Sequence, residues 1–461
     1  MSTRIEKDSL GELAVPAEAY YGVHTCRSIQ NFGAAGEPIP LEMIHGMVKL
    51  KWACAKANHV LDLMPKDKLD AIAGACQRIL KGEFSDQFPV DCFQAGSGTS
   101  SNMNVNEVIS NIANEAMGGK RGDRGLVHPN DDVNKGQSTN NIFPSGIRVA
   151  CIDLTDALIP ALQKLIAALQ AKGVEFADVI RSGRTHLQDA VPETLGQAFD
   201  AWAHALVKDI RRLEAARDRL LEIGAGGNAI GTGVNTKKAF RAEIARAMGE
   251  ISGKPYRRSE NGIEITQFLT DMADMSAALR FVAIDINKCC NDLRLLCSGP
   301  NTGFAEVTLP AVEPGSSIMP GKINPSICEA SNMACLQVMG NDHAVQLAAN
   351  AGQLELNTHM PVTGLNLVKS FRILTRTAVM LADKCIGGII ANRERCYHYF
   401  ETSGGLGTIL NPVLGYDKVA ALVKESLKTK KTAREIVVEK GIMTGEDFDK
   451  LVKHCTGPNL D

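Results

Sequence analysis

The sequence is poor in the residue patterns that build β-sheets. Phe, Trp and Tyr together make up only 5% of its 461 residues, and runs in which β-branched and polar residues alternate are rare. Because aromatic and β-branched side chains favour strands, a chain with so few of these patterns is not expected to form a large sheet. The sequence therefore predicts an all-α fold.

The sequence also lacks a surplus of charge and a long apolar run. Its 50 basic and 52 acidic residues leave a net charge of only -2, which gives no basic footprint for nucleic acid or an anionic membrane. The longest apolar stretches, such as residues 158–169, contain Gln and Lys and are shorter than the roughly 20 residues that span a bilayer. Residues 1–8 are charged with no apolar run behind them, so no signal peptide is expected. We expect a cytoplasmic protein that binds neither nucleic acid nor membrane.

Cysteine is present, but not in a pattern typical of metal sites or disulfides. The 13 cysteines are scattered along the chain without a CxxC motif, and there is no HExxH motif. Cys289 and Cys290 are the only close pair, and adjacent residues cannot form an ordinary disulfide. Most of the others lie in apolar helical stretches, where cysteine acts as a small hydrophobic residue. We expect no structural disulfide, no metal and no cofactor.

The sequence does contain long apolar repeats at helical spacing. Leu158, Leu162, Leu165 and Leu169 recur every three or four residues, as expected for one face of an amphipathic helix. The same spacing occurs in residues 195–213, 264–296, 326–356 and 362–390. Residues 140–390 are therefore predicted to form five helices of roughly 25 to 35 residues, each on the order of 40 Å long.

Helices of this length predict both an oligomer and a division into domains. They cannot all bury their apolar faces within one narrow monomer, and small residues such as Ala334, Gly340 and Ala348 would let subunits pack closely. Shorter helical patterns flank the long ones, as at residues 45–61, 416–428 and 432–439. We expect an obligate oligomer with three domains per chain: an N-terminal α domain (1–139), a central domain of five long helices (140–390) and a small C-terminal α domain (391–461).

Three loops carry more hydroxyl and amide side chains than a linker needs. Residues 96–104 combine glycines with small polar side chains that can bind an anion, although a helix start capped by Thr99 or Ser100 explains them as well. Residues 136–141 open the first long helix, where the helix dipole favours an anion and ordinary capping is again the alternative. Residues 183–189 contain His186, either as a functional histidine among polar neighbours or as a turn residue that caps a helix.

A fourth loop is the most informative. Residues 315–325 read Gly-Ser-Ser-Ile-Met-Pro-Gly-Lys-Ile-Asn-Pro, so that glycines and prolines shape a loop that can still move. The loop also carries a hydroxyl pair, an ammonium and an amide within nine positions. These groups suit a carboxylate whose charge grows as a proton leaves the neighbouring carbon.

At this loop the sequence resembles the fumarase/aspartase superfamily. The hallmark G-S-S-x-M-P-x-K-x-N-P of that family is met in full by residues 315–325, and the resemblance continues over essentially the whole chain. It includes residues 96–107, 128–134, 136–141, 183–197, 231–236 and 291–300. The resemblance implies an all-α homotetramer with a twenty-helix core, active sites shared between three subunits, a small dicarboxylate substrate and no cofactor.

The resemblance implies catalytic roles for Ser316, His186 and Glu329, and substrate binding by Lys322 and Asn324. Ser316 would be the base that removes the proton from carbon. Lys322 and Asn324 would hold the carboxylate beside that carbon, where the aci-carboxylate intermediate concentrates negative charge. His186 would pair with Glu329, and in the fumarase branch this dyad handles the leaving water.

Further residues are implied to bind the substrate or a second anion. The substrate's carboxylates and leaving group would be oriented by Thr99, Ser138, Thr139, Asn140 and Thr185. Residues 128–132 look like a family loop that binds anions at a secondary site, here through His128 and Asn130, so no metal is assigned there. Arg184 and Asp189 are expected to be structural ion partners.

The resemblance divides between two branches of the family. Five segments are closer to the aspartase sequence pattern: residues 20–25, 138–140, 189–192, 293–296 and 351–356. Three are closer to the fumarase pattern: residues 98–105, residues 131–132 and Gly321. The expected activity is that of an aspartate ammonia-lyase, the reversible deamination of L-aspartate to fumarate and ammonia by anti-elimination through an aci-carboxylate carbanion. The alternatives are a fumarate hydratase that interconverts L-malate and fumarate, and a catalytically silent structural member like a lens crystallin.

One position departs from the family pattern. The family usually has Asp at the end of the Ser-Thr/Ser-Asn-Asp run, and Asn141 stands there in this chain. A negative charge near the start of the first long helix is therefore missing.

Overall fold

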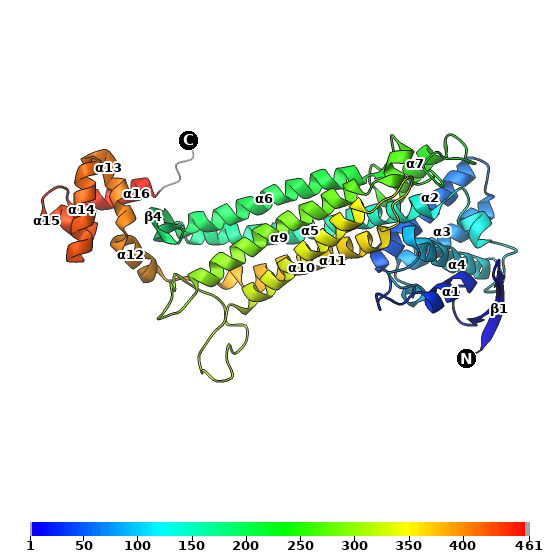
Figure 1. The fold of residues 1–461 in the computed structure, drawn as a ribbon, viewed down its shortest axis with the longest axis horizontal. Helices are drawn as coiled ribbons and strands as arrows, with labels where there is room; N and C mark the ends of the chain where they lie inside the picture. Colours follow the sequence, from blue (N-terminus) through cyan, green and yellow to red (C-terminus); the bar gives the residue numbers. More distant parts are fainter. Residues whose placement is uncertain (1, 457–461) are drawn as a thin grey trace. The chain divides into compact units, whose positions relative to one another are not determined.

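The computed structural model describes residues 2–456, and helices dominate it. Five helices are longer than the rest (Figure 1). They are α5 (Thr139–Glu175), α6 (Leu195–Leu220), α9 (Thr270–Leu296), α10 (Ser326–Asn350) and α11 (Met360–Lys384). Their lengths of 25 to 37 residues confirm the predicted set of long helices and the all-α class.

Three of these helices are shorter than the apolar spacing predicted: α9 begins later, and α10 and α11 end earlier. The run 264–296 is broken at Phe268 into the short helix α8 (Gly262–Gln267) and α9. Helix α10 stops at Asn350, because residues 351–358 fold into a turn in which Gln353 and Leu356 pair as an isolated bridge. Helix α11 stops at Lys384 and is followed by a 3-10 turn, Ile386–Gly388. The apolar spacing continues through Ile386 and Ile389, which are buried, whereas Leu354 in the turn after α10 is 86% exposed.

Contacts divide the chain into two compact units. Unit 1 contains residues 1–158, 211–281 and 337–374, and unit 2 contains residues 159–210, 282–336 and 375–461. Each of the five long helices contributes residues to both units. The division into domains 1–139, 140–390 and 391–461 is not tested by these units and stays a prediction.

Unit 1 is built around helix α2 (Leu41–Val60), whose buried face includes Met43, Ile44 and Met47. Gly46 of α2 lies against the backbone of Gly146 in α5, and a Cβ at Gly46 would collide with the Gly146 carbonyl oxygen. The close approach of these two helices therefore depends on glycine. Besides α8 and parts of the long helices, unit 1 contains β1 (Thr3–Asp8), β2 (Gly11–Pro16), α1 (Val23–Asn31), α3 (Lys66–Leu80), the 3-10 turns Ser85–Gln87 and Gly96–Gly98, α4 (Thr99–Ala116), the π-helical turn Pro129–Val133, β5 (Glu222–Ile223), α7 (Phe240–Ser252) and β6 (Arg257–Arg258).

Unit 2 contains a β-hairpin, a second pair of short strands and a separate small core. The hairpin is β3 (Ile180–Thr185) with β4 (Gln188–Thr194), and β7 (Val307–Thr308) pairs antiparallel with β8 (Ile390–Ala391). The small core is formed by α12 (Arg393–Thr402), the 3-10 turn Gly404–Leu406, α13 (Gly407–Leu414), α14 (Tyr416–Thr429), α15 (Ala433–Glu439) and α16 (Gly445–Cys455). Helices α14 and α15 confirm the two short helices predicted there, and Thr432 with Glu435 forms a capping box at the start of α15.

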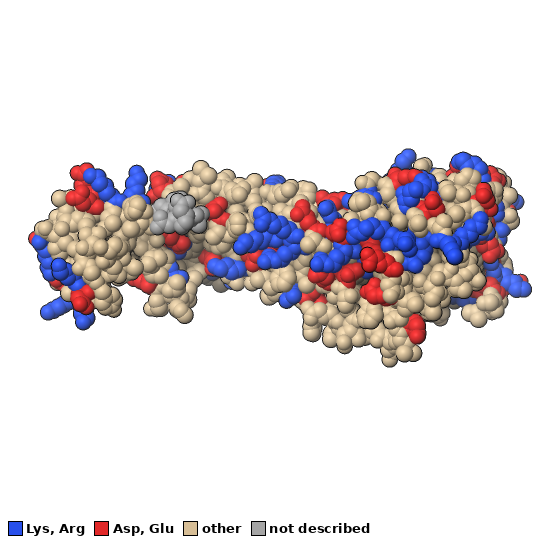
Figure 2. Space-filling model, turned by 90° about the horizontal axis from the view of Figure 1, so that it is seen from above, with Lys and Arg blue, Asp and Glu red and all other residues tan. Residues whose placement is uncertain are grey.

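The surface is mixed in charge. On the face drawn in Figure 2, Lys and Arg side chains lie beside Asp and Glu, with uncharged areas between them. Within residues 2–456, no helix combines the length and the apolar character needed to cross a membrane.

Candidate active site

Residues 315–325, which we call the GSS loop, lie between α9 and α10. Figure 1 shows this segment standing out from both helices. The neck of the loop is closed by two hydrogen bonds: the Gly315 N–H donates to the Lys322 carbonyl oxygen (3.0 Å), and Asn324 Nδ2 donates to the Gly315 carbonyl oxygen (2.7 Å). A Cβ at Gly315 would meet the Lys322 carbonyl oxygen. The loop is therefore closed at its base, and its tip is exposed, with Ile318 86% accessible.

Two backbone amides support the hydroxyl of Ser316. The N–H groups of Ile318 and Met319 donate to Ser316 Oγ at 3.1 and 3.0 Å. Such donors stabilise a negatively charged oxygen more than a neutral one, and they favour loss of the serine proton. Lys322 is exposed, and within residues 2–456 its Nζ makes no hydrogen bond or ion pair, so the charge can be used by a ligand.

His186 occupies the turn of the hairpin, which we call the His186 hairpin (residues 180–194). Thr185 pairs with Gln188, and the two residues between them, His186 and Leu187, have φ of 57° and 58°. Two left-handed residues in a two-residue loop are the mark of a type I′ turn. Non-glycine residues in this conformation are strained by about 1–3 kcal/mol each, and such strain is concentrated at functional sites. His186 is thus an exposed turn residue, and the alternative that it caps a helix is wrong, since α6 starts only at Leu195.

Glu329 lies half-buried in the first turn of α10. No hydrogen bond or ion pair joins its side chain to that of His186 within residues 2–456. Their pairing, implied by the family resemblance, stays a prediction.

In unit 1, Thr99 is the first residue of α4, and Gly98 is the N-cap with φ of 83°. The prediction that Thr99 or Ser100 caps this helix is therefore wrong by one or two residues. A Cβ at Gly98 would collide with the ring of Phe143, so glycine is required there. Thr99 is thus not the N-cap of α4. Its side chain lines a cavity of about 570 Å³ together with Ser100 and Asn130.

The Ser138–Asn141 run is fixed by hydrogen bonds at the start of α5. Ser138 Oγ accepts from the Asn140 N–H (3.3 Å), and Asn140 Nδ2 donates to the Ala229 carbonyl oxygen (2.8 Å). Thr139 is the first residue of the helix.

Asn141 is 1% exposed, and its Nδ2 donates to Thr266 Oγ1 (2.8 Å). The Thr266 hydroxyl in turn donates to the Gly262 carbonyl oxygen (2.7 Å). Since that hydroxyl hydrogen is already in use, Thr266 Oγ1 can only accept, which suits an amide and not a carboxylate. The surroundings therefore match the Nδ2 group of Asn141, whereas its buried Oδ1 has no hydrogen-bond partner within residues 2–456.

The predicted secondary anion site also has a defined geometry. His128 Nδ1 accepts from the N–H groups of Asn130 and Asp131 (3.2 and 3.1 Å), so His128 caps the π-helical turn. The His128 N–H donates to Asp132, which is also paired with Lys68 (2.7 Å). Asn130 lines the same cavity as Thr99. Across residues 2–456 there is no cluster of His, Cys, Asp or Glu side chains arranged to hold a metal ion.

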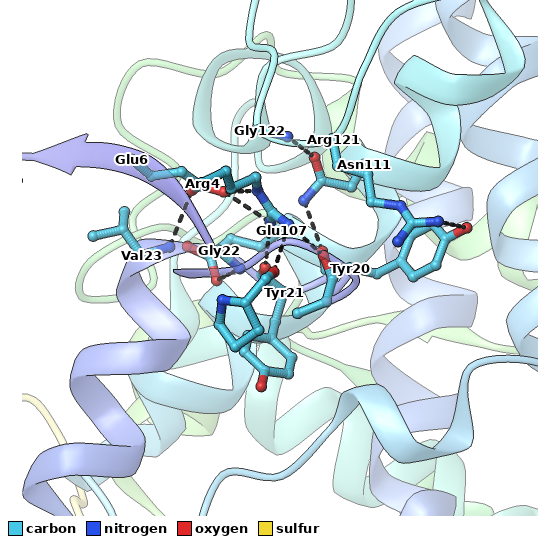
Figure 3. A network of polar contacts seen from close by, with 12 residues as sticks. Arg4, Glu6, Tyr20, Tyr21, Gly22, Val23, Glu107, Asn111, Arg121 and Gly122 are labelled. Carbon is cyan, nitrogen blue, oxygen red and sulfur yellow. Dashed lines mark hydrogen bonds and ion pairs between the residues drawn. The ribbon is translucent and has the colours of Figure 1, made fainter. Parts of the chain in front are cut away.

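A network near this cavity was not foreseen from the sequence (Figure 3). Glu107 accepts from the N–H groups of Gly22, His24 and Thr25, at 2.9, 2.9 and 3.2 Å, and Glu6 accepts from Val23 N–H at 3.1 Å. Two buried carboxylates thus cap the start of α1, which satisfies its free N–H groups.

The two carboxylates fix the start of α1. His24 and Arg27 of this helix line the cavity together with Thr99. Glu107 lies 82 to 85 positions from the groups that it binds, so no local pattern could have found it. Burial lowers the pKa of His24.

The predicted site residues belong to both units. Unit 1 holds Thr99, Ser138, Thr139, Asn140, His128 and Asn130, and unit 2 holds Thr185, His186, Ser316, Lys322, Asn324 and Glu329. Within residues 2–456, the hydrogen bonds among these twelve residues are those of Ser138 with Asn140 and of His128 with Asn130. Arg184 is a structural ion partner as predicted, since it pairs with Glu306, but Asp189 forms no ion pair among the described residues.

Comparisons with known proteins agree on a family. Residues 11–340 match the family described as lyase, and residues 406–454 match the fumarase C C-terminus. The aspartate ammonia-lyase of Pseudomonas aeruginosa is 46% identical over 445 residues, which cover 96% of this chain and 94% of that protein. The class II fumarate hydratase of Thermosynechococcus vestitus is 43% identical over 452 residues, which cover 98% of this chain and 97% of that protein.

Solved structures give the same result. The fumarate lyase:delta crystallin from Brucella melitensis bound to cobalt superposes with a TM-score of 0.96 at 43% identity, covering 99% of this chain and 100% of that one. The recombinant class II fumarase from Schistosoma mansoni gives a TM-score of 0.92 at 38% identity, with 98% of each chain covered. The chain therefore belongs to the lyase family, within the superfamily of the aspartate ammonia-lyases and class II fumarases.

Proposed function

We propose that this chain is an aspartate ammonia-lyase, which converts L-aspartate reversibly into fumarate and ammonia. The observation that carries the proposal is the hydroxyl of Ser316, which accepts two backbone N–H bonds in an exposed loop that also carries the ammonium of Lys322. The choice of substrate is supported by the full-length relatives named aspartate ammonia-lyase at 44 to 46% identity. We also propose the family's homotetramer, with active sites shared between three subunits, and a cytoplasmic location.

The proposed reaction begins at the carbon next to one carboxylate. Ser316 Oγ, as the alkoxide, takes a proton from this carbon, and the electron pair of the C–H bond moves into the carboxylate to give an aci-carboxylate. The ammonium of Lys322 offsets the second negative charge that develops there. The electron pair then forms the C=C bond as the C–N bond breaks and ammonia leaves from the opposite face.

The remaining site residues bind and orient the substrate in this proposal. Hydroxyl and amide groups hold the carboxylates and the amine; they are those of Thr99, Ser138, Thr139, Asn140, Thr185 and Asn324. His186 and Glu329 serve the leaving group, and His128 with Asn130 holds a second anion. A group placed in this way lowers the barrier by fixing the reacting atoms in line.

Fumarate hydratase is the second candidate, and a specific observation favours it. The relatives include a class II fumarate hydratase at 43% identity over nearly the full length of both chains, close to the value for the aspartate ammonia-lyases. Both activities use the same base and the same carboxylate, and differ in whether ammonia or water leaves. A protein active toward neither substrate would be the third candidate, a silent structural member of the family.

A paired assay separates the three candidates. The purified protein is given L-aspartate or L-malate, and the ultraviolet absorbance of fumarate is recorded together with released ammonia. The proposal predicts fumarate and ammonia in equal amounts from aspartate. Rapid turnover of malate without turnover of aspartate would replace it with fumarate hydratase, and the absence of both would leave the structural member.

A further inference from the structure

A group of buried thiols in unit 2 joins α9, α10 and the residue after α11. It consists of Cys290 of α9, Cys328 of α10 and Cys385, which directly follows α11. Each of the three side chains is at most 1% exposed, and each is a free thiol. The sequence indicated only small apolar residues here, because the three cysteines lie far apart in the chain and no local motif joins them.

Cys328 is the centre of this group. Its Sγ lies 3.7 Å from the Sγ of Cys385. Hydrogen bonds from Cys290 and Cys385 lower the pKa of the Cys328 thiol, although burial opposes this change. The same bonds, together with burial, raise the pKa of Cys290 and that of Cys385. Cys328 is therefore the thiol of the three that loses its proton first and acts as the nucleophile.

Cys328 and Cys385 are placed so that a disulfide could join them. Their sulfur atoms are in contact at 3.7 Å and would have to approach to roughly 2.05 Å in an S–S bond. Cys385 lies between the end of α11 and the 3-10 turn Ile386–Gly388, so its movement leaves α11 intact. Cys328 is the third residue of α10. Both partners thus lie at helix ends, where local opening costs less than in the centre of a helix.

A small hydroperoxide is the oxidant that suits this pair, because it can reach a thiol that is exposed only by local opening. The Cys328 thiolate attacks one peroxide oxygen, so that an S–O bond forms, the O–O bond breaks and the leaving hydroxide takes up a proton as water; the product is a sulfenic acid. The Cys385 thiol then attacks this sulfur, the S–S bond forms, and the S–O bond breaks to release a second water. Two electrons and two protons pass from the thiols to hydrogen peroxide.

A bond between these sulfurs would act on the start of α10. Glu329 follows Cys328 directly, and Pro325, which ends the GSS loop, precedes it by three residues. A disulfide from Cys328 to Cys385 would tie this turn to the end of another helix. It would shift Glu329 and restrain the base of the GSS loop, and a loop that has to close over a substrate would then close more slowly.

We propose that Cys328 and Cys385 form a redox-sensitive dithiol, which a hydroperoxide converts into a reversible disulfide, and that this bond lowers activity by restraining the first turn of α10. The effect on activity rests on the proposed function of Glu329 and the GSS loop, whereas formation of the disulfide does not. A dithiol reductant reverses the reaction by thiol–disulfide exchange.

The test treats the reduced full-length protein with hydrogen peroxide. The remaining thiols are alkylated under denaturing conditions, and the protein is digested with trypsin and a glutamate-specific protease. Cleavage after Glu329 separates Cys328 from Cys335, and cleavage after Lys384 releases the peptide that begins with Cys385. Mass spectrometry should show a cross-linked pair of peptides that contains Cys328 and Cys385 and that is absent after treatment with dithiothreitol.

Activity is measured on the same samples. The kcat of the oxidised protein should be roughly 10- to 100-fold lower, as for small misplacements of catalytic groups, and should return to the starting value after reduction.

Three variants make the test specific. Cys385→Ala removes one sulfur of the pair and should lose both the cross-linked peptide and most of the inhibition by peroxide. Cys290→Ala removes the neighbouring thiol and should still form the cross-link. Cys335→Ala is the matched control, because Cys335 is equally buried on the same helix as Cys328, and it should respond to peroxide as the wild type does.

The outcomes separate the thiol chemistry from the function on which its effect depends. The absence of a cross-linked peptide in the wild type, or a cross-link from Cys328 to Cys290 instead, would overturn the proposed pair. A disulfide that forms without lowering kcat would overturn the effect on activity. If the reduced wild type turns over neither aspartate nor malate, the proposed function fails, and mass spectrometry, which needs no substrate, still decides whether the disulfide forms.

Discussion

The 128–141 segment and the GSS loop both carry predicted binding residues, yet they are held in opposite ways. The 128–141 segment bonds outward to other elements: Asp132 pairs with Lys68 of α3, and Asn134 accepts from Lys51 of α2 at 2.7 Å. The hydrogen bonds of Gly315, Ser316 and Asn324 stay within the GSS loop itself.

This difference suggests that the two segments have different functions. A segment tied to several helices opens only with much of the fold, whereas a loop with internal bonds and an exposed tip moves at small cost. Catalytic loops need such movement to close over a substrate and exclude water. We therefore expect changes in the GSS loop to act mainly on catalysis, and changes in the 128–141 segment to act mainly on stability.

The largest effect is expected for Ser316→Ala. Loss of the base should lower kcat by roughly 10³-fold or more, while the midpoint of thermal unfolding stays unchanged, because the side-chain hydrogen bonds of Ser316 within residues 2–456 stay inside the GSS loop. The matched control is Ser317→Ala, whose hydroxyl receives no backbone N–H within residues 2–456 and whose loss should cost less than about tenfold. Equal losses for the two serines would remove Ser316 as the base.

Lys322→Met should have the next largest effect. The ammonium meets the carboxylate before the reaction and the larger charge during it, so KM should rise and kcat should fall together, with kcat/KM lower by roughly 10²- to 10³-fold. Steady-state kinetics with aspartate measures both constants. A normal KM would contradict the role of Lys322 in binding.

In the 128–141 segment, Asn141→Asp should act mainly on stability. The carboxylate cannot donate to Thr266 Oγ1, and a buried polar contact is lost, so the free energy of unfolding should fall by about 1–3 kcal/mol. Denaturant unfolding measures this change. The double variant Asn141→Leu with Thr266→Val replaces both polar partners by apolar side chains and should be less destabilised than Asn141→Leu alone; a larger loss would show that the Asn141–Thr266 contact does not determine the effect.

The smallest expected effect concerns Lys51, and it is a change in how the free energy of unfolding depends on pH. Burial lowers the pKa of Lys51 to about 7 in the folded protein, below its ordinary value near 10.4. The unfolded chain therefore binds more protons between these values, so stability should rise with pH from about 7 upward, by at most about 1.4 kcal/mol per pH unit. Lys51→Met should reduce this slope.

The comparison at Lys51 has a matched control on the same helix. Lys49 is paired with Asp153 and is partly exposed, so Lys49→Met should keep the wild-type slope. Unfolding measured in denaturant from pH 7 to 9 gives all three slopes. A wild-type slope in Lys51→Met would mean that Lys51 is charged in the folded state.

Much of this architecture could be predicted from the sequence, because its signals are local. The apolar spacing of Leu158 to Leu169 lies within one helix, and the eleven residues of the GSS loop are contiguous. The His186 hairpin gave no strand pattern, since Arg181 and Arg184 bind a carboxylate and the strand has no alternating apolar face. Glu306 and Glu107 bind groups more than 80 positions away, and such pairs leave no trace in spacing.

The central claim is that Ser316 transfers the proton at carbon, and the most direct measurement is deuterium incorporation in the reverse reaction. Fumarate and ammonia are incubated with the protein in D₂O, and the L-aspartate formed is analysed by NMR. We expect one deuterium at the methylene carbon, in the single position anti to nitrogen, and no product above background with Ser316→Ala. Deuterium in both positions, or product formed by Ser316→Ala at the wild-type rate, would contradict the account.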